Sequence, residues 1–299
     1  MNDKNVEQVP SQTALFTALR RALAHKQYQN EKFGPDNLAE IFLPASYRFF
    51  MRFKKIRERA RNQLAAAMPG MNEYIIARTA FFDRLFLQAL QGQAPQIVLL
   101  GAGYDSRAYR FAPANRGTRI FELDAPPTQD RKLKCLKKAH IRIPEQVRYV
   151  PVNFMSEALG DVLEKAGYNS QERTLFIWEG VSYYLEREAV VETLGFASRS
   201  HSDSVIAFDY TISISDENAQ AYYGASVFLE AMRVYHTSEG LLFSMEQGEM
   251  ETFLAENSLR IVEHLDHEAI EQKYLTDENG MLIGRMIEIF RLVCASPAI

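Results

Sequence analysis

The chain has 299 residues, of which 47% are hydrophobic and 24% are charged. These are ordinary values for a globular protein with one large α/β domain or two modest domains. The formal net charge of -4 at pH 7 gives no general electrostatic reason to bind nucleic acid, so we expect no such partner. Two distant cysteines, Cys135 and Cys294, predict buried free thiols in a reducing compartment. Because no segment resembles a secretory signal or reaches about 18 uninterrupted apolar residues, we expect a soluble cytoplasmic protein without stable membrane association.

The first third of the chain is predicted to be helical. Residues 11–92 contain few glycines, and their apolar residues recur three and four positions apart. We therefore expect an N-terminal helical cap over residues 1–92. Within it, residues 47–57 alternate basic and aromatic side chains. A basic helix of this kind can lie on a membrane surface, but a solvated basic face with its aromatic rings packed inward is more common, and we expect the latter.

From residue 97 onwards, short apolar strands alternate with helices, which predicts a parallel sheet covered on both faces. The expected strands lie near 97–101, 119–123, 148–152, 174–179 and 204–209, and the expected helices near 126–139, 156–166 and 187–199. A mainly helical insertion is predicted over 215–256. Two last strands, near 259–264 and 285–295, are expected to form an antiparallel pair at one edge.

The predicted fold is therefore an α/β, doubly wound, mostly parallel, Rossmann-like seven-stranded sheet. It ends in an antiparallel C-terminal edge hairpin. An N-terminal helical extension precedes this α/β domain, which is assigned to residues 93–299 and carries the helical insertion as a lid.

A glycine turn follows the first predicted strand. Gly101 and Gly103 allow a sharp turn with no side chain facing a ligand, and Asp105 stands where a helix N-cap belongs. Asp124 ends the next strand about 20 residues further on, where a carboxylate can accept hydrogen bonds from ribose hydroxyls. A dinucleotide fingerprint would have a third glycine in place of Ser106. Its absence favours a cofactor without phosphates, such as S-adenosyl-L-methionine, and the alternative is a turn that binds nothing.

Further polar residues stand at predicted strand ends and on the helix before the first strand. The Asn153 amide can bond an adenine edge while Phe154 covers its face, or Asn153 caps a helix with Phe154 in the core. Glu179 needs a cation, which is either the ammonium of a methionine-like ligand or an internal lysine or arginine. Arg78 can clamp a carboxylate, and the rival is an ion pair with Asp83, five residues away and outside the favoured helical spacing.

Three runs of sequence resemble the leucine carboxyl methyltransferase family, which also includes bacterial polyketide O-methyltransferases. They are LLGAGYDSRAYRF at 99–111, FELD at 121–124 and WEGVSYYL at 178–185, and the resemblance extends over residues 75–210. It implies a class I methyltransferase that uses S-adenosyl-L-methionine. It implies that Arg78 binds the methionine carboxylate of the cofactor and that Glu179 binds its ammonium group. It also implies that Gly101 and Gly103 approach the methionine and ribose portions and that Asp124 binds the ribose hydroxyls.

The resemblance is less complete at the remaining positions. The family usually has an aspartate where this chain has Asn153, so the contact to the adenine amino group lacks charge here. Tyr184 matches a family tyrosine near the substrate and is the candidate catalytic residue. Tyr222 and His236, in the insertion that should cover the pocket, are further candidates for a base or an orienting group.

The expected activity is O-methylation of a small-molecule carboxylate or hydroxyl, with a role in secondary metabolism. A carboxylate is already ionised near neutral pH and needs no base, whereas a phenol would benefit from one. The alternatives are an NAD-type oxidoreductase, which leaves Glu179 and Arg78 unexplained, and a protein that binds the cofactor without turnover. His264 and His267 are spaced by three, but no other ligand converges on them, so we expect no metal site. The sequence does not indicate an oligomeric state.

Overall fold

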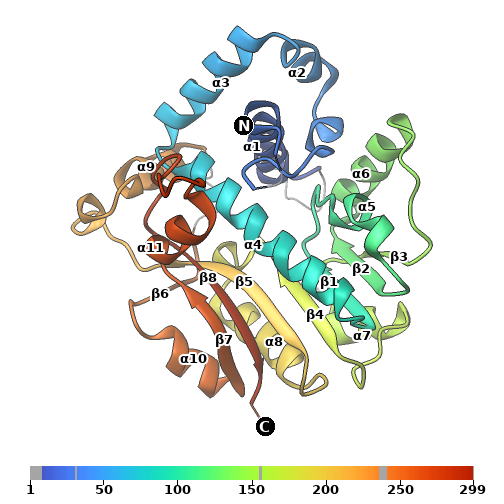
Figure 1. Ribbon diagram of the computed structural model, residues 1–299. Coiled ribbons are helices and arrows are strands. Elements are labelled where there is room, and N and C mark those ends of the chain that lie inside the picture. The colour runs from blue at the N-terminus through green and yellow to red at the C-terminus, as the bar shows by residue number, and fades with distance from the viewer. Residues whose placement is uncertain (1–8, 31, 155–156, 236–240, 299) are drawn as a thin grey trace.

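The computed structural model describes residues 9–30, 32–154, 157–235 and 241–298. Its centre is one sheet in which seven strands lie in the order β3-β2-β1-β4-β5-β8-β7 (Figure 1). The strands that are parallel to one another are β1 (Gln96–Leu100), β2 (Arg119–Asp124), β3 (Val147–Pro151), β4 (Thr174–Trp178) and β5 (Val205–Ile212). The predicted α/β fold is confirmed. All five residues of β1 and of β4 are buried, as expected for parallel strands with helices on both faces.

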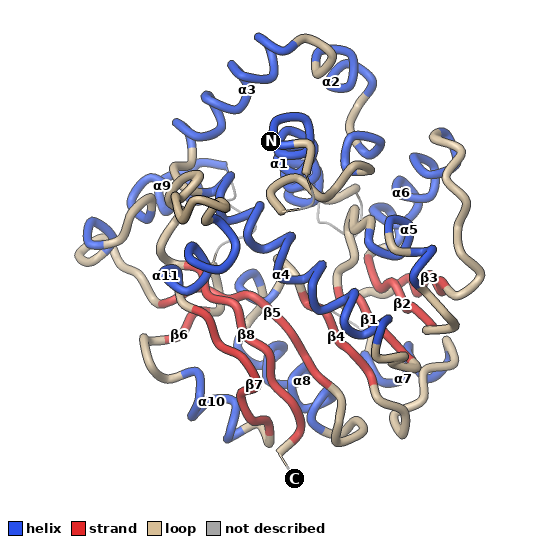
Figure 2. The backbone as a smooth tube through the Cα atoms, viewed as in Figure 1, coloured by secondary structure: helices blue, strands red, loops and turns tan. Residues whose placement is uncertain are grey.

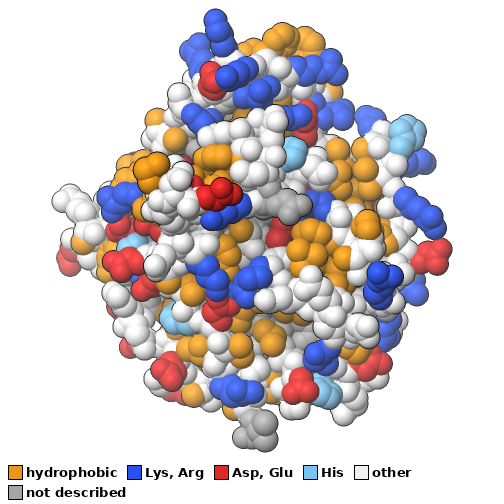
Figure 3. All heavy atoms as spheres, viewed as in Figure 1, with side chains coloured by type: hydrophobic (Ala, Val, Ile, Leu, Met, Phe, Trp, Pro, Cys, Tyr) orange, Lys and Arg blue, Asp and Glu red, His pale blue; other side chains and the backbone are white. Residues whose placement is uncertain are grey.

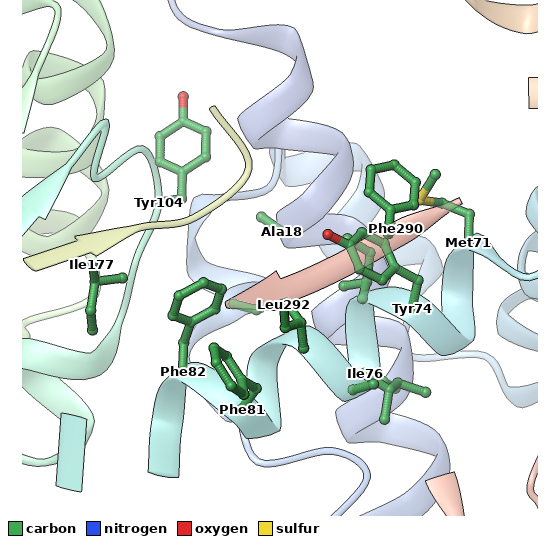
Figure 4. Packing of buried hydrophobic residues seen from close by; sticks show 14 of the residues in the cluster. Ala18, Met71, Tyr74, Ile76, Phe81, Phe82, Tyr104, Ile177, Phe290 and Leu292 are labelled. Atoms are coloured by element: carbon green, nitrogen blue, oxygen red, sulfur yellow. The ribbon is translucent and has the colours of Figure 1, made fainter. Parts of the chain in front are cut away.

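Helices cover the two faces of the sheet (Figure 2). One face carries α1 (Gln12–Tyr28), α4 (Met71–Gln91) and α6 (Pro126–Lys138), and the other carries α7 (Leu159–Lys165), α8 (Arg187–Ser198) and α10 (Met250–Glu256). Because strand side chains alternate, Ile97 and Leu99 of β1 join the first core, whereas Val98 and Leu100 join the second. Figure 4 shows the first core, in which rings from α4 pack beside side chains of β4 and β8.

The C-terminal strands close the sheet as an antiparallel pair. Strand β8 (Phe290–Pro297) lies between β5 and the edge strand β7 (Leu259–Leu265) and is antiparallel to both. The predicted start of the last strand at residue 285 was wrong. The backbone amides of Met286 and Ile287 donate to Glu271 and to the carbonyl of Gly70 instead of to a neighbouring strand. The connection from β7 to β8 contains α11 (His267–Ile270) and a π-helix (Glu271–Leu275).

The region predicted as a helical insertion contains one strand as well. It includes α9 (Ala225–Tyr235) and α10, but the two-residue strand β6 (Ser244–Met245) pairs in parallel with the end of β5. Phe228 and Met232 of α9 are buried in the core. These two side chains therefore pack as ordinary core residues.

The basic and aromatic segment forms α2 (Ala45–Phe50) and the start of α3 (Lys54–Ala67), which project from the rest of the molecule in Figure 1. The expectation that its aromatic rings pack inward was wrong. Phe49, Phe50 and Phe53 are 53%, 50% and 49% exposed, and neither helix contains a buried residue. Figure 3 shows hydrophobic and basic side chains next to each other on this part of the surface. No helix in the described ranges is long and apolar enough to span a membrane.

Candidate functional site

The glycine turn after β1 lies beside the carboxyl end of β2. Gly101 and Gly103 adopt the left-handed region, with φ of 69° and 45°. A Cβ atom on Gly101 would lie only 2.7 Å from a methyl group of Val181, so a side chain has no room there. The backbone N–H of Gly103 donates to the Asp124 carboxylate, and the N–H of Ala125 donates to Asp124 Oδ1 at 2.7 Å. The turn and the carboxylate thus form one unit, as the sequence predicts.

Burial raises the pKa of Asp124 to about 6, although the two backbone donors favour its ionised form. Each donor bonds a different oxygen, and each carboxylate oxygen can accept more than one hydrogen bond. Asp124 therefore has acceptor capacity left for hydroxyl groups of a ligand.

The helix after the turn begins one residue later than expected. Ser106, not Asp105, is the N-cap of α5 (Arg107–Arg110). Asp105 Oδ1 accepts a hydrogen bond from the backbone N–H of Arg107 at 2.7 Å, which explains why the N-cap pattern pointed to it. The Ser106 hydroxyl donates to the buried Asp36 carboxylate at 2.7 Å, so the position of the missing third glycine is filled by a structural contact.

Arg78 lies on α4 and contacts the segment that follows β4 and one residue inside β5. Its Nε donates to Glu179 Oε1 at 3.1 Å, and its Nη1 donates to Asp209 Oδ2 at 3.1 Å and to the Tyr183 hydroxyl at 3.2 Å. For Nη2, no hydrogen bond is found within the described residues. The rival ion pair of Arg78 with Asp83 does not form.

Asp83 instead pairs with two arginines of α5. Arg107 Nε and Arg110 Nη2 both lie 2.7 Å from Asp83 Oδ1. Arg107 Nη1 also contacts Asp105 Oδ2 at 2.5 Å and Glu179 Oε2 at 2.7 Å. The internal arginine that the sequence left open as a partner for Glu179 is thus present, and there are two of them, Arg78 and Arg107.

This ion network has an excess of negative charge. Among the described residues, four guanidinium groups face five carboxylates, those of Asp36, Asp83, Asp105, Glu179 and Asp209. Burial opposes ionisation of Glu179, but Arg107 and Arg78 lower its pKa below the ordinary value. At 12% exposure Glu179 is the most exposed of the five, compared with 9% or less for the others. It is therefore the carboxylate that a cationic ligand group can reach most easily.

Asn153 and Phe154 follow β3 at the same edge of the sheet. The N–H of Asn153 donates to the Glu157 carboxylate at 2.8 Å. Phe154 is 43% exposed, so the alternative that places this ring in the core is wrong.

Tyr184 is the last residue of a 3₁₀ turn (Ser182–Tyr184) that follows β4. Its ring centroid lies 4.6 Å from that of Tyr183. Tyr222 is half-buried, and His236 lies outside the described residues. His264 Nε2 lies 2.8 Å from the Tyr210 hydroxyl. The described part of the chain holds no group of three or more residues that could bind a metal.

Sequence reasoning missed Asp209, Tyr74 and Arg107. Asp209 is fully buried and accepts a hydrogen bond from the Tyr74 hydroxyl at 2.5 Å. It is the last residue of the strand predicted at 204–209, so the rule that selected Asp124 and Glu179 would also have indicated Asp209.

The start of α1 lies over the glycine turn. A Cβ atom on Gly103 would be 3.3 Å from the Cβ atom of Ala14, and the Ser11 N–H donates to the Thr128 hydroxyl at 3.0 Å. The N-terminal helices thus border the edge of the sheet where these residues gather.

Comparison with known proteins agrees with this geometry. Residues 14–198, more than half of the chain, match the family model described as leucine carboxyl methyltransferase. The chain belongs to this family. It is a methyltransferase that depends on S-adenosyl-L-methionine.

Two relatives and two solved structures illustrate the match. YktD of Bacillus subtilis, named among the S-adenosyl-L-methionine-dependent methyltransferases, is 28% identical over 91% of this chain and 93% of its own length. A similarly named protein of Mycolicibacterium paratuberculosis is 34% identical over 59% of this chain and 56% of its own. A structure from Thermobifida fusca, titled as a methyltransferase, shares the fold with a TM-score of 0.60 at 13% identity, covering 97% and 96% of the two chains. One from Streptomyces avermitilis has a TM-score of 0.58 at 14% identity, covering 81% and 90%.

Proposed function

We propose that this methyltransferase transfers the methyl group of S-adenosyl-L-methionine to an oxygen atom of a small-molecule carboxylate or hydroxyl, in secondary metabolism. The observation that carries the proposal is the match to a carboxyl methyltransferase family, together with the ion network at the strand ends. We also propose that residues 1–92 form a helical cap and residues 93–299 the methyltransferase domain.

The residues at the strand ends fit the cofactor. The turn at Gly101 and Gly103 would bring the backbone to the methionine and ribose portions, and Asp124 retains acceptors for the two ribose hydroxyls. Asn153 and Phe154 would bond and cover the adenine. These five residues would hold the adenosine half.

The ion network would hold the methionine half. Glu179 would accept the ammonium group, which would compensate the excess negative charge of the network. Arg78 would offer Nη2 to the carboxylate of the cofactor. The guanidinium of Arg78 can lie this close to residue 180 because that residue is a glycine, whose Cβ atom would otherwise lie 3.0 Å from Arg78 Nη1. Two charges of opposite sign would thus fix the amino-acid end of the cofactor.

When bound, the cofactor would supply a methyl group attached to a sulfonium. The acceptor oxygen would attack the methyl carbon, and the electron pair of the breaking carbon–sulfur bond would go to sulfur. The protein contributes mainly position, because holding the reacting atoms about 3 to 3.5 Å apart can supply roughly 7 to 11 kcal/mol. A carboxylate acceptor has no proton to lose. A hydroxyl acceptor must give up its proton to a basic group or to water, and Tyr184 would orient that hydroxyl.

Calorimetric titration with S-adenosylhomocysteine, followed by incubation with methyl-labelled cofactor and an extract of the native cells, tests the proposal. We expect binding and a labelled methyl ester, which alkali cleaves, or a labelled ether, which alkali leaves intact. Label on nitrogen or carbon would refute O-methylation. Absence of binding together with affinity for a nicotinamide cofactor would favour an oxidoreductase, and binding without transfer to any acceptor would favour a non-catalytic protein.

A further inference from the structure

Residues 45–61 form a surface that the proposed function does not use. This segment, which we call the basic-aromatic surface, comprises α2, the turn after it and the first half of α3. It contains seven lysine and arginine residues and one glutamate, a net charge of +6. Because the whole chain has a net charge of -4, the other residues together carry -10. This concentration of positive charge on one projecting segment (Figure 1) indicates a partner with negative charge.

The basic-aromatic surface also exposes large apolar side chains to solvent. Five of them are between 41% and 53% exposed: Tyr47, Phe49, Phe50, Phe53 and Ile56. The ring centroid of Phe49 lies 5.7 Å from that of Phe50 and 5.6 Å from that of Phe53, so these three rings form one cluster. An exposed apolar cluster with polar residues around it is typical of a site where another molecule binds.

The backbone holds the ring cluster in an ordered conformation. In the turn between α2 and α3, the N–H of Phe53 donates to the carbonyl of Phe50 at 3.1 Å. Arg57 Nη1 donates to the carbonyl of the buried Met51 at 2.7 Å. Further along α3, Leu64 packs against the core. The segment is therefore attached to the rest of the protein at Met51 and Leu64, and between them it presents its rings and charges to solvent.

We propose that the basic-aromatic surface binds an anionic lipid bilayer, as a peripheral and reversible contact. Aromatic rings are favoured at the level of the lipid head groups, and lysine and arginine side chains are attracted to anionic head groups. Arg52 and Lys55 are exposed and form no ion pair with any described residue, so their charges are available to such head groups.

A bilayer fits both kinds of side chain on this segment. It offers a layer of negative charge with an apolar layer directly below, so the basic groups and the rings can be satisfied together. An acidic protein would match the charge but not the ring cluster. None of the residues proposed for the cofactor lies on this surface, so its test does not depend on methyl transfer.

Co-sedimentation with lipid vesicles tests the proposal. The full-length protein would be mixed with vesicles of phosphatidylcholine alone, or with about one third phosphatidylglycerol to supply negative charge. We expect the wild type to bind the anionic vesicles at least tenfold more tightly than the neutral ones. Most of this preference should disappear at about 1 M salt, where the screening length falls to about 3 Å. A wild type that binds neither kind of vesicle, or both equally, would overturn the proposal.

Charge reversal assigns the binding to this surface. The double variant Arg52→Glu with Lys55→Glu should bind anionic vesicles at least tenfold more weakly than the wild type. The matched control, Lys137→Glu with Lys138→Glu, makes the same change of charge at two exposed residues of α6 and should stay within about threefold of the wild type. Equal losses in the two double variants would mean that only the total charge matters, and would overturn the assignment.

Ring removal tests the apolar contribution. Phe49→Ser with Phe50→Ser should also weaken vesicle binding at least tenfold, while the melting temperature stays that of the wild type because both rings are exposed. Val262→Ser, at a side chain of β7 that is 56% exposed, is the control and should bind as the wild type does. Unchanged binding in the ring variant would overturn the proposed contact of the rings with lipid.

A tryptophan probe distinguishes a bilayer from other partners. The chain has one tryptophan, Trp178, which is buried, so Phe50→Trp places a second indole where only it can meet lipid. Lipids brominated in their acyl chains should quench this indole. Absence of quenching, or binding to polyglutamate as tight as to anionic vesicles, would favour an acidic protein and overturn the proposal. So would sedimentation velocity that shows a dimer formed through Phe49 and Phe50, if this dimer does not bind vesicles.

Discussion

Protonation of Asp124 should control cofactor affinity. Its pKa of about 6 in the ligand-free protein means that only about one tenth of the molecules carry the carboxylate at pH 5. Ribose hydroxyls donate to the ionised form, so affinity for S-adenosylhomocysteine should be constant above pH 7 and about tenfold weaker at pH 5, a loss of about 1.4 kcal/mol.

The variant Asp124→Asn removes the titrating group. The loss of charge-assisted hydrogen bonds should cost about 1.5 to 3 kcal/mol, or roughly 10- to 150-fold in affinity, and the remaining affinity should not change between pH 5 and pH 7.5. Calorimetric titration across this range measures both effects. Asp130→Asn, on the exposed surface of α6, is the matched control and should behave as the wild type does.

Two results would refute this reasoning: a wild-type affinity that is the same at pH 5 and pH 7.5, or wild-type affinity in Asp124→Asn.

The raised pKa of Asp124 also affects the stability of the folded state. Because the folded state holds the Asp124 proton more tightly than the unfolded state, its contribution to stability is present below about pH 4 and is lost as the pH rises through about 6.

Arg78→Met should lower the free energy of unfolding by about 3 to 5 kcal/mol, because the buried Asp209 loses its cation; a loss under about 1 kcal/mol in urea unfolding would contradict the pairing. Lys132→Met should cost a similar amount, since Glu122 and Lys132 are both 1% exposed and 2.6 Å apart. Adding Glu122→Gln should recover more than half of that loss, and no recovery in the double variant would count against the ion pair. Gly101→Ala should destabilise the protein by about 1 to 3 kcal/mol, because its φ is positive and its Cβ atom would meet a side-chain methyl; an unchanged melting curve would speak against this conformation.

Much of the sheet could be predicted from the sequence, because its patterns are local. The strand expected at 97–101 is β1 at Gln96–Leu100, and the one expected at 174–179 is β4 at Thr174–Trp178. Short apolar runs that end at turn residues carry this information within a few positions. The two-residue strand β6 has no such apolar run. It forms because it pairs with the end of β5, more than 30 residues earlier in the chain, and local patterns do not show this pairing.

Local sequence patterns indicate the candidate residues that stand at strand ends, but they do not indicate which distant segments form ion pairs. The positions of Gly101, Gly103 and Asp124 follow from one β-turn-α-β pattern, and the structure brings the two glycines and the carboxylate together. The partners of Arg78 lie 101 and 131 residues away in the sequence, so helical spacing could only suggest the nearby Asp83.

The sequence by itself determined the α/β order of elements, the glycine turn and the carboxylate at the end of β2, because periodicity, turn chemistry and strand ends are properties of neighbouring residues. Only the tertiary structure decided which arginine meets which carboxylate, that Phe49 is exposed, and that Arg20 is buried without an anion. Burial and ion pairing depend on which other elements pack against a side chain. For Arg20, on α1, those elements are α3 and α4, which lie more than 30 residues later in the sequence.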